Sequence, residues 1–140
     1  EIIWTAKVRE ATGGEDPQCD SAGVISYHAG DPPDRRMQRA LRDCGYRVFG
    51  RARQIQPSDF GEFDWILAMD RSNLANALGL LADDAPERDR VRLFCEFAGI
   101  SGASEVPDPY YGGADGFKHV IQLIETGCDN LIGKFGIASR

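Results

Sequence analysis

Apolar residues recur at helical spacing in four parts of the chain. The segments with the three-and-four spacing of an amphipathic helix are residues 1–11, 31–44, 70–82 and 113–132. Gly13 is expected to end the first helix, because glycine readily adopts the conformation that follows a helix. Asp31 is expected to cap the second helix, with prolines in its first turn, and Gly45 is expected to end it.

Three further segments are predicted as strands: residues 18–22, 65–69 and 91–95. The segment WILAM, residues 65–69, is apolar at every position, as is typical of a strand buried on both faces of a parallel sheet. Strands that alternate with helices imply βαβ units joined by right-handed crossovers. The sequence therefore predicts an α/β fold, with an open parallel sheet and helices on both of its faces.

The length and composition are those of one globular domain, residues 1–140. The chain is 42% hydrophobic and 27% charged, and its formal net charge is −6. Because phosphate neutralisation drives most nucleic-acid binding, an acidic chain without a basic run is not expected to bind nucleic acid. The chain has neither a secretory signal pattern nor an apolar stretch of the about 18 residues that a bilayer span requires. A cytoplasmic protein without a membrane partner is therefore predicted.

The cysteines do not form a recognisable metal or redox motif. They are Cys19, Cys44, Cys95 and Cys128. None belongs to a CxxC pair, and the two histidines, His28 and His119, are far apart, whereas a zinc site needs clustered ligands. Cys95 and Cys128 fall on apolar faces and are expected to lie in the core. No metal site, disulfide framework or cofactor is expected.

Asp108 lies between two prolines and is followed by Tyr110 and Tyr111. The proline rings leave the backbone around this aspartate little freedom. The loop follows the predicted strand 91–95, and ligands of open parallel sheets bind beyond the carboxyl ends of the strands. A rigid carboxyl beside aromatic rings suits a general acid next to a pocket for a planar group. From the residues alone, a turn in which the aspartate binds backbone amides is the favoured explanation.

Five other polar positions have simpler explanations. Asp70 begins the sequence Asp-Arg-Ser-Asn at a strand-to-helix junction, where a helix cap is favoured over catalysis. Arg51 and Arg53 are either anion contacts or solvated charges, and solvation is favoured. His119 lies off the apolar stripe of its helix and is expected to face solvent. Tyr27 follows the first predicted strand, and local packing is favoured over a role as a pocket wall.

Five stretches of the sequence occur in an order and at an approximate spacing that are typical of one known protein family. They are DSAG (20–23), PPDRRM (32–37), RARQI (51–55), DFGEFDWILAMDRSN (59–73) and EVPDPYYGG followed by GF (105–113 and 116–117). The block 59–73 and the DPYYGG loop are specific in combination. Together the stretches resemble the low molecular weight protein-tyrosine-phosphatases, and the resemblance covers the chain from about Asp20 to Leu131.

The resemblance implies hydrolysis of phosphate monoesters through a cysteinyl-phosphate intermediate. In this family a loop of cysteine, five residues and arginine wraps the phosphate and supplies a thiolate nucleophile. The resemblance makes Asp108 the general acid that protonates the leaving phenol, and then the base that activates water. Tyr110 resembles one wall of the phosphotyrosine slot, and Tyr27 resembles the aromatic residue that faces it. The implied substrate is a phosphotyrosine protein or a small aryl phosphate. Tyr110 and Tyr111 also match tyrosines that can be phosphorylated in the family.

The nucleophile loop of the family has no match in the sequence. At the sixth position after each cysteine, where the family has arginine, stand Ile25, Gly50, Ser101 and Lys134. In the family this loop and the first strand, which lies inside the sheet, come before the helix that resembles residues 1–11. We therefore expect the chain to be N-terminally truncated, to lack that interior strand and to be inactive as it stands.

Two other functions stay open from the sequence. A pseudophosphatase that binds phosphorylated partners without turnover would not need the nucleophile loop. Arsenate reduction uses a related fold and a similar loop, but it calls for additional redox cysteines near the site. Cys95 and Cys128 are not obviously placed for that chemistry, and the DPYYGG loop favours aryl substrates.

Overall fold

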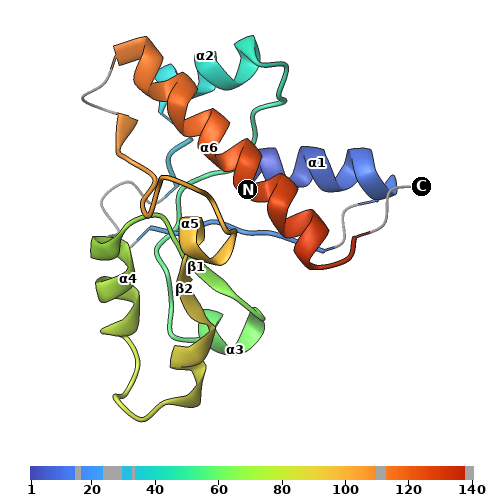
Figure 1. Ribbon diagram of the computed structural model, residues 1–140. Coiled ribbons are helices and arrows are strands. Elements are labelled where there is room, and N and C mark those ends of the chain that lie inside the picture. The colour runs from blue at the N-terminus through green and yellow to red at the C-terminus, as the bar shows by residue number, and fades with distance from the viewer. Residues whose placement is uncertain (15–16, 24–29, 33, 110–112, 138–140) are drawn as a thin grey trace.

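The computed structural model describes residues 1–14, 17–23, 30–32, 34–109 and 113–137. The helices of the described chain are α1 (Ile2–Thr12), α2 (Arg35–Asp43), α3 (Asp59–Glu62), α4 (Arg71–Leu78), the 3-10 helix η1 (Pro86–Arg90), α5 (Phe94–Phe97) and α6 (Gly113–Lys134) (Figure 1). The strands are β1 (Ile66–Ala68) and β2 (Val91–Leu93). Within these ranges, no helical stretch combines the length and the apolar character that a bilayer span needs.

Strands β1 and β2 pair in parallel, with Ile66 opposite Val91. Successive side chains of a strand point to opposite faces of a sheet. Ile66 and Val91 accordingly pack on one face, in a cluster that includes Leu74 of α4. Leu67 packs from the other face against a larger core to which α1 and α6 contribute. The predicted α/β class and parallel sheet are confirmed, and helices pack against both faces of the described strands.

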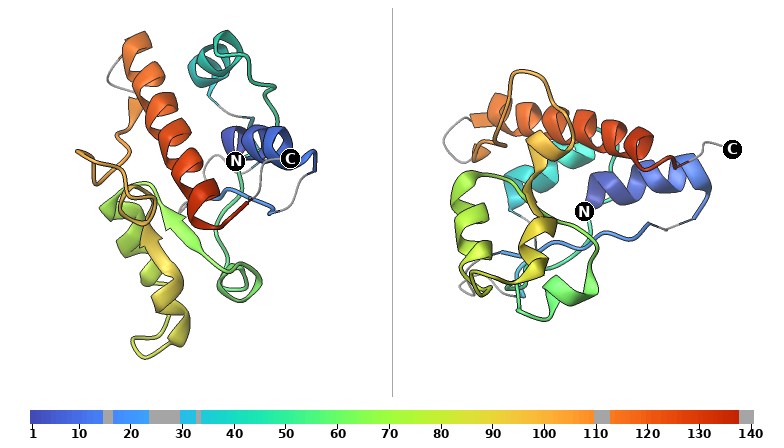
Figure 2. Two further views of the ribbon diagram at one scale, coloured as in Figure 1. Left: turned by 45° about the vertical axis from the view of Figure 1, so that its right-hand side comes forward. Right: turned by 60° about the horizontal axis from the view of Figure 1, so that its bottom comes forward.

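The larger core lies between α6 and the two helices beside it. Helix α6 contacts α1 and α2, and Figure 2 shows it lying beside both. Val8 and Ile121 are buried here, with 0% and 1% of their surfaces exposed. Trp4 is also buried, and its indole N–H donates to the carbonyl oxygen of Pro17 at 2.9 Å. The apolar stripe of the first helix therefore continues through Trp4 and Val8, while Ala6 is only partly buried.

Most of the predicted elements are present with somewhat different ends. Gly13 ends α1 with a φ of 77°, the left-handed conformation expected of a glycine at that place. The helices predicted over 70–82 and 113–132 correspond to α4 and α6. The strands predicted over 65–69 and 91–95 correspond to β1 and β2, and β2 is short because α5 begins directly after it.

Helix α2 begins later than predicted, because Asp34 rather than Asp31 is its cap. The carboxylate of Asp34 accepts hydrogen bonds from the N–H groups of Arg36 at 2.8 Å and Met37 at 3.4 Å. The carbonyl oxygen of Asp31 instead accepts from the N–H of Ala52 at 2.6 Å. Both aspartates suit the cap position, so a contact with a distant part of the chain decides where the helix starts.

The strand predicted over residues 18–22 is not formed. In the described part of this region, a single parallel bridge pairs Gly23 with Gln54. The carboxylate of Asp20 accepts from the N–H of Ser21 at 2.8 Å. Such local hydrogen bonds from an aspartate compete with the backbone pairing that a strand needs.

Two glycines of α6 lie in opposite surroundings. A Cβ at Gly127 would lie 2.3 Å from Cζ of the buried Phe94, whereas a Cβ at Gly133 would have nothing within 4 Å. We expect Gly127→Ala to destabilise the fold by about 1–2 kcal/mol, because overpacking outweighs the gain of about 1 kcal/mol in helix propensity. Gly133→Ala has only the gain and is the matched control. Urea unfolding measures both, and a stabilised Gly127→Ala protein would contradict this packing.

Candidate functional site

The loop that carries Asp108 is attached to the carboxyl end of β1. The N–H of Val106 donates to the carbonyl oxygen of Met69, the residue directly after β1, at 2.8 Å. The side chain of Val106 belongs to the larger core and is 6% exposed. The loop therefore lies at the edge of the sheet where the sequence predicted a functional site.

A second attachment joins the same loop to the start of α4. The carboxylate of Glu105 accepts from the backbone N–H of Arg71 at 2.7 Å. The Arg71 guanidinium lies 3.4 Å from the other carboxylate oxygen of Glu105 and donates to the hydroxyl of Ser104 at 3.1 Å. Residues 104–106 are thus held against the corner between β1 and α4, and Asp108 follows directly.

On its other side, Asp108 is followed by a proline that packs against α6. A Cβ added at Gly116 would lie 3.4 Å from the carbonyl oxygen of Pro109, so only a small residue fits there without pressing on the loop. Asp108 itself is exposed. Tyr27, Tyr110 and Tyr111 lie outside the described residues, so the aromatic walls beside this carboxyl remain a prediction.

Asp70 is the cap of α4, as the sequence analysis favoured. Its carboxylate accepts from the N–H of Asn73 at 2.7 Å. This contact satisfies one of the backbone donors that the first turn of a helix leaves without a partner. The carboxyl group of Asp70 is therefore used in building the corner that supports the Asp108 loop.

The interpretation of Arg53 as a solvated charge is wrong, whereas Arg51 is exposed, as predicted. Arg53 donates through both terminal nitrogens to the carboxylate of Asp59, at 2.9 and 3.1 Å, and through Nε to Asp20 at 3.1 Å. Arg51 donates to the carbonyl oxygen of Gly30 at 3.0 Å. Both arginines therefore connect segments that are far apart in the sequence.

Asp59, a buried acid that the sequence analysis did not single out, is the anchor of this network. It is 6% exposed, and its carboxylate also accepts from the N–H of Gln56 at 2.7 Å. The hydrogen bonds from Arg53 hold the pKa of this carboxyl below its usual value. The sequence signal was the closeness of Asp59 to RARQI, but nothing local indicated that the acid would be buried.

A hollow of about 310 Å³ lies between the start of α1, α2 and α6. Its walls are largely apolar and include Phe49 and Ile121. At one side the hydroxyl of Ser21 donates to the carboxylate of Glu1 at 2.8 Å. Asp108 is not among the residues that line it, so this hollow is distinct from the loop that carries the acid.

The described cysteines are poorly suited to act as nucleophiles. Cys95 and Cys128 are buried in the larger core, as predicted. Burial raises the pKa of the Cys128 thiol to about 12, and it also raises the pKa of Cys95 and of Cys19. A raised pKa leaves little thiolate, which is the reactive form. Cys44 is exposed but has no arginine at the sixth position after it.

Titratable groups do not gather into a metal site in the part of the chain that the structure describes. There, no three side chains of His, Cys, Asp or Glu come close enough together to hold an ion. His119 of α6 is exposed, as predicted, and His28 lies outside the described residues.

Comparison with known sequences identifies the family. Residues 3–138 match the model of the low molecular weight phosphotyrosine protein phosphatases. A Synechocystis sp. protein, whose name assigns it to the low molecular weight protein-tyrosine-phosphatases, is 50% identical over 138 residues, which are 97% of this chain and 86% of that protein. The low molecular weight protein-tyrosine-phosphatase of Streptomyces coelicolor is 37% identical over 134 residues, 94% of this chain and 81% of that protein.

Solved structures agree with the sequence matches. A protein tyrosine phosphatase from Entamoeba histolytica superposes with a TM-score of 0.87 at 36% identity, over 97% of this chain and 86% of that one. YfkJ from Bacillus subtilis superposes with a TM-score of 0.85 at 33% identity, over 97% of this chain and 84% of that one. The chain therefore belongs to the low molecular weight phosphotyrosine protein phosphatase family.

Proposed function

We propose that this domain hydrolyses phosphotyrosine esters and that Asp108 supplies the proton for the leaving group. The observation that carries the proposal is the double attachment of residues 104–106 to the corner between β1 and α4. This attachment holds a proline-bracketed carboxyl beyond the end of a parallel strand, where substrates of such sheets bind. The names of the relatives support a tyrosine phosphatase, and the proposed substrate is a phosphotyrosine protein or a small aryl phosphate.

The proposed reaction has two steps, and Asp108 acts in both. A cysteine thiolate attacks phosphorus, the bond between phosphorus and the phenolic oxygen breaks, and the Asp108 carboxyl gives its proton to that oxygen. The Asp108 carboxylate then takes a proton from a water molecule that attacks the cysteinyl phosphate. Inorganic phosphate leaves and the thiolate is restored. Tyr27 and Tyr110 are proposed as the walls on either side of the phenyl ring, and Tyr110 and Tyr111 as sites of regulatory phosphorylation.

None of the four cysteines has the arginine at the sixth position after it that the family's nucleophile loop has. We therefore propose that a polypeptide of these 140 residues alone, which would lack the nucleophile loop and the interior strand, does not turn over an aryl phosphate. The same observation favours a second function for the 140 residues taken alone. In that function the domain binds phosphorylated partners without hydrolysing them.

The test is to join the first strand and the Cys-x5-Arg segment of a family member ahead of Glu1. We expect this loop-completed protein to release phosphate from a phosphotyrosyl peptide, whereas the 140-residue chain and a Cys→Ser variant of the added loop release none. The reason is that only a thiolate held by the loop amides and arginine attacks phosphorus effectively. Phosphate release in single and multiple turnovers measures the effect, and cooperative thermal unfolding shows that each protein is folded.

The outcome also separates the two functions. Tight binding of the phosphotyrosyl peptide by the folded, loop-completed protein without any phosphate release would contradict the enzyme and support the binding domain. Neither binding nor release by that protein would contradict both functions.

A further inference from the structure

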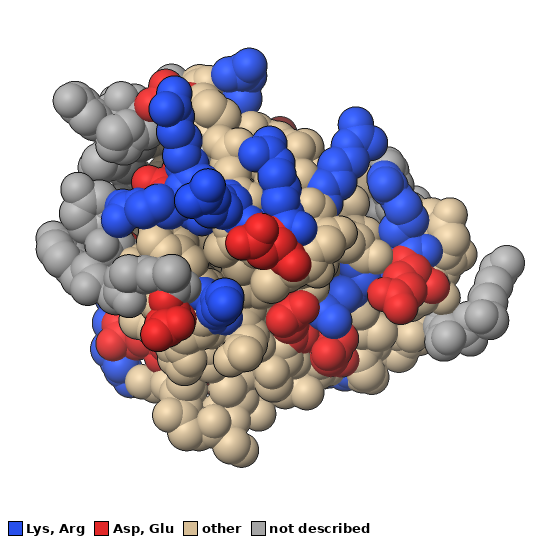
Figure 3. Space-filling model, turned by 90° about the horizontal axis from the view of Figure 1, so that it is seen from above, with Lys and Arg blue, Asp and Glu red and all other residues tan. Residues whose placement is uncertain are grey.

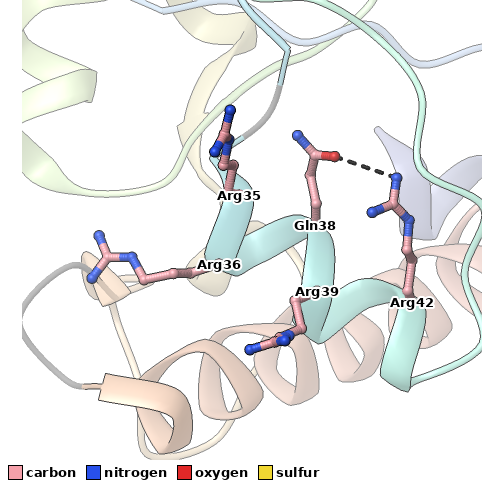
Figure 4. A pocket seen from close by; sticks show the side chains of 5 residues that line it. All are labelled: Arg35, Arg36, Gln38, Arg39 and Arg42. Atoms are coloured by element: carbon pink, nitrogen blue, oxygen red, sulfur yellow. Dashed lines mark hydrogen bonds between the residues drawn. The ribbon is translucent and has the colours of Figure 1, made fainter.

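Helix α2 carries a cluster of basic side chains on its exposed surface. The members of this α2 arginine cluster are Arg35, Arg36, Arg39 and Arg42. Together with Gln38 they line a hollow of about 460 Å³ (Figure 4). Figure 4 shows Arg35, Gln38 and Arg42 pointing to one side of the helix, whereas Arg36 and Arg39 point to another.

The cluster contrasts with the charge of the whole chain. Residues 35–43 contain four arginines and a single acidic residue, Asp43, whereas the chain has a formal net charge of −6. In the view of Figure 3, most of the basic side chains lie in the upper half of the picture, and most of the acidic side chains lie in the lower half. A local positive surface on an acidic protein attracts anionic groups selectively.

The described structure neutralises only part of this charge. Arg36 lies 3.6 Å from the carboxylate of Asp34 and stacks over the ring of Phe117, 5.1 Å from its centre. Arg42 donates to the side-chain oxygen of Gln38 at 3.4 Å, which leaves its charge in place. Among the described residues, no carboxylate forms an ion pair with Arg35, Arg39 or Arg42.

The arrangement also works against the helix that carries it. Like charges three or four positions apart on a helix repel each other. Cations in the first turn, such as Arg35 and Arg36, oppose the helix dipole, and the carboxylate of the cap residue Asp34, 3.6 Å from Arg36, offsets this only in part. A helix that keeps these charges in spite of the cost to its stability points to a function for them in binding an anion.

The cluster lies beside the part of the molecule that holds Asp108. Helix α2 packs against α6, and Arg36 lies over Phe117 near the start of α6. Pro109, directly after Asp108, packs against Gly116 of the same stretch. A phosphotyrosine placed at Asp108 would therefore have its neighbouring residues within reach of α2.

We propose that the α2 arginine cluster binds an acidic stretch of the protein substrate beside its phosphotyrosine, a proposal that rests on the function proposed above. Arg35 and Arg42 are seven positions apart, which is about 10 Å along a helix axis. About three residues of an extended peptide span the same length. Guanidinium groups form paired hydrogen bonds with carboxylates, so Asp and Glu side chains suit this surface. The preferred substrates are then phosphoproteins with Asp or Glu close to the phosphotyrosine.

The test uses the 140-residue chain and a fluorescent peptide rich in glutamate that contains no phosphotyrosine. At low ionic strength, we expect the chain to bind this glutamate peptide more tightly than a glutamine version of the same peptide, as measured by fluorescence anisotropy. Arg39→Glu is expected to weaken binding about fivefold, and Arg39→Glu with Arg42→Glu about 20-fold. Arg92→Glu changes the net charge by the same amount at an exposed arginine outside the cluster, and is expected to have little effect.

A second readout separates binding from folding. Because Arg35→Glu removes a repulsion and places an acid in the first turn, we expect this variant to keep or raise the melting temperature while it binds the acidic peptide more weakly. Equal affinity for the two peptides, or equal losses in Arg39→Glu and Arg92→Glu, would overturn the proposal. So would a single-stranded oligonucleotide that binds through the same arginines more tightly than the acidic peptide.

The proposal and the phosphatase function fail in different ways. If the loop-completed protein releases phosphate but does not bind the acidic peptide, only the proposed role of the α2 arginine cluster is contradicted. In a folded loop-completed protein, retained acidic-peptide binding without phosphate release removes the catalytic function and, with it, the cluster's role in substrate recognition.

Discussion

Replacing Asp108 by asparagine is expected to lower kcat of the loop-completed protein by about 10²- to 10⁴-fold on a phosphotyrosyl peptide. Asparagine has the same shape as aspartate but has no acidic proton to give to the departing phenolate. The exchange leaves the attachments of the loop through Glu105 and Val106 intact. Substrate binding should therefore change little, and steady-state kinetics should assign the loss to kcat.

The leaving group provides the sharpest control for this prediction. An aryl phosphate whose phenol is strongly acidic needs little proton donation, so Asp108→Asn should slow its cleavage much less than that of the peptide. Asp83→Asn, at an exposed acid in the connection after α4, should leave both rates unchanged. Full activity of Asp108→Asn on the poor leaving group would remove this residue from the role of general acid.

Replacing Arg53 by methionine is expected to lower the free energy of unfolding by about 2–3 kcal/mol at neutral pH. The change leaves the carboxylate of Asp59, a side chain that is only 9% exposed, without its cation. The expected loss is below the range for fully buried pairs because the Arg53 side chain is 35% exposed. Chemical denaturation of the two proteins at matched pH measures the difference.

The same pair of proteins has a characteristic dependence on pH. The pKa of Asp59 is lowered in the folded state, so its contribution to stability is present above the unfolded pKa and is lost as the pH falls through the folded value. In Arg53→Met the buried, unpaired carboxylate of Asp59 instead destabilises the folded state, and its protonation at low pH reduces this cost. The difference between the proteins should therefore be largest near neutral pH and shrink below about pH 4.

Asp20→Asn is the matched control, because Asp20 meets the same guanidinium but is itself 44% exposed. It should cost less than about 1 kcal/mol. An equal loss in the two variants would contradict the assignment of Asp59 as the anchor of the network.

The features that the sequence predicted well are those decided within a few residues. The segment WILAM needs only its own side chains to be recognised as a strand, although its predicted burial on both faces is wrong at Trp65 and Met69, which are 40% and 37% exposed. The cap formed by Asp70 depends on a group three positions away. The prolines around Asp108 likewise restrict that loop locally. The strand and the cap agree between sequence and structure because no distant contact competes with the local preference, whereas burial depends on what the rest of the chain packs against the strand.

The features that were missed depend on parts of the chain that meet only in the folded state. Asp31 and Asp34 are both suitable caps, and the hydrogen bond from Ala52 decides between them. The pairing of Arg53 with Asp59 depends on the burial of α3, which no local sequence pattern predicts. The expectation of a solvated Arg53 failed for the same reason.

The fixed position of the loop before Asp108 has a consequence for how a proton would be delivered. A catalytic group on a free loop must be brought to rest each time a substrate arrives, and the lost disorder adds to the activation barrier. Here the hydrogen bonds of Val106 and Glu105 restrain the loop as the chain folds. Solvent viscosity is then expected to have little influence on the protonation step, because these hydrogen bonds already hold residues 105 and 106 when the substrate arrives.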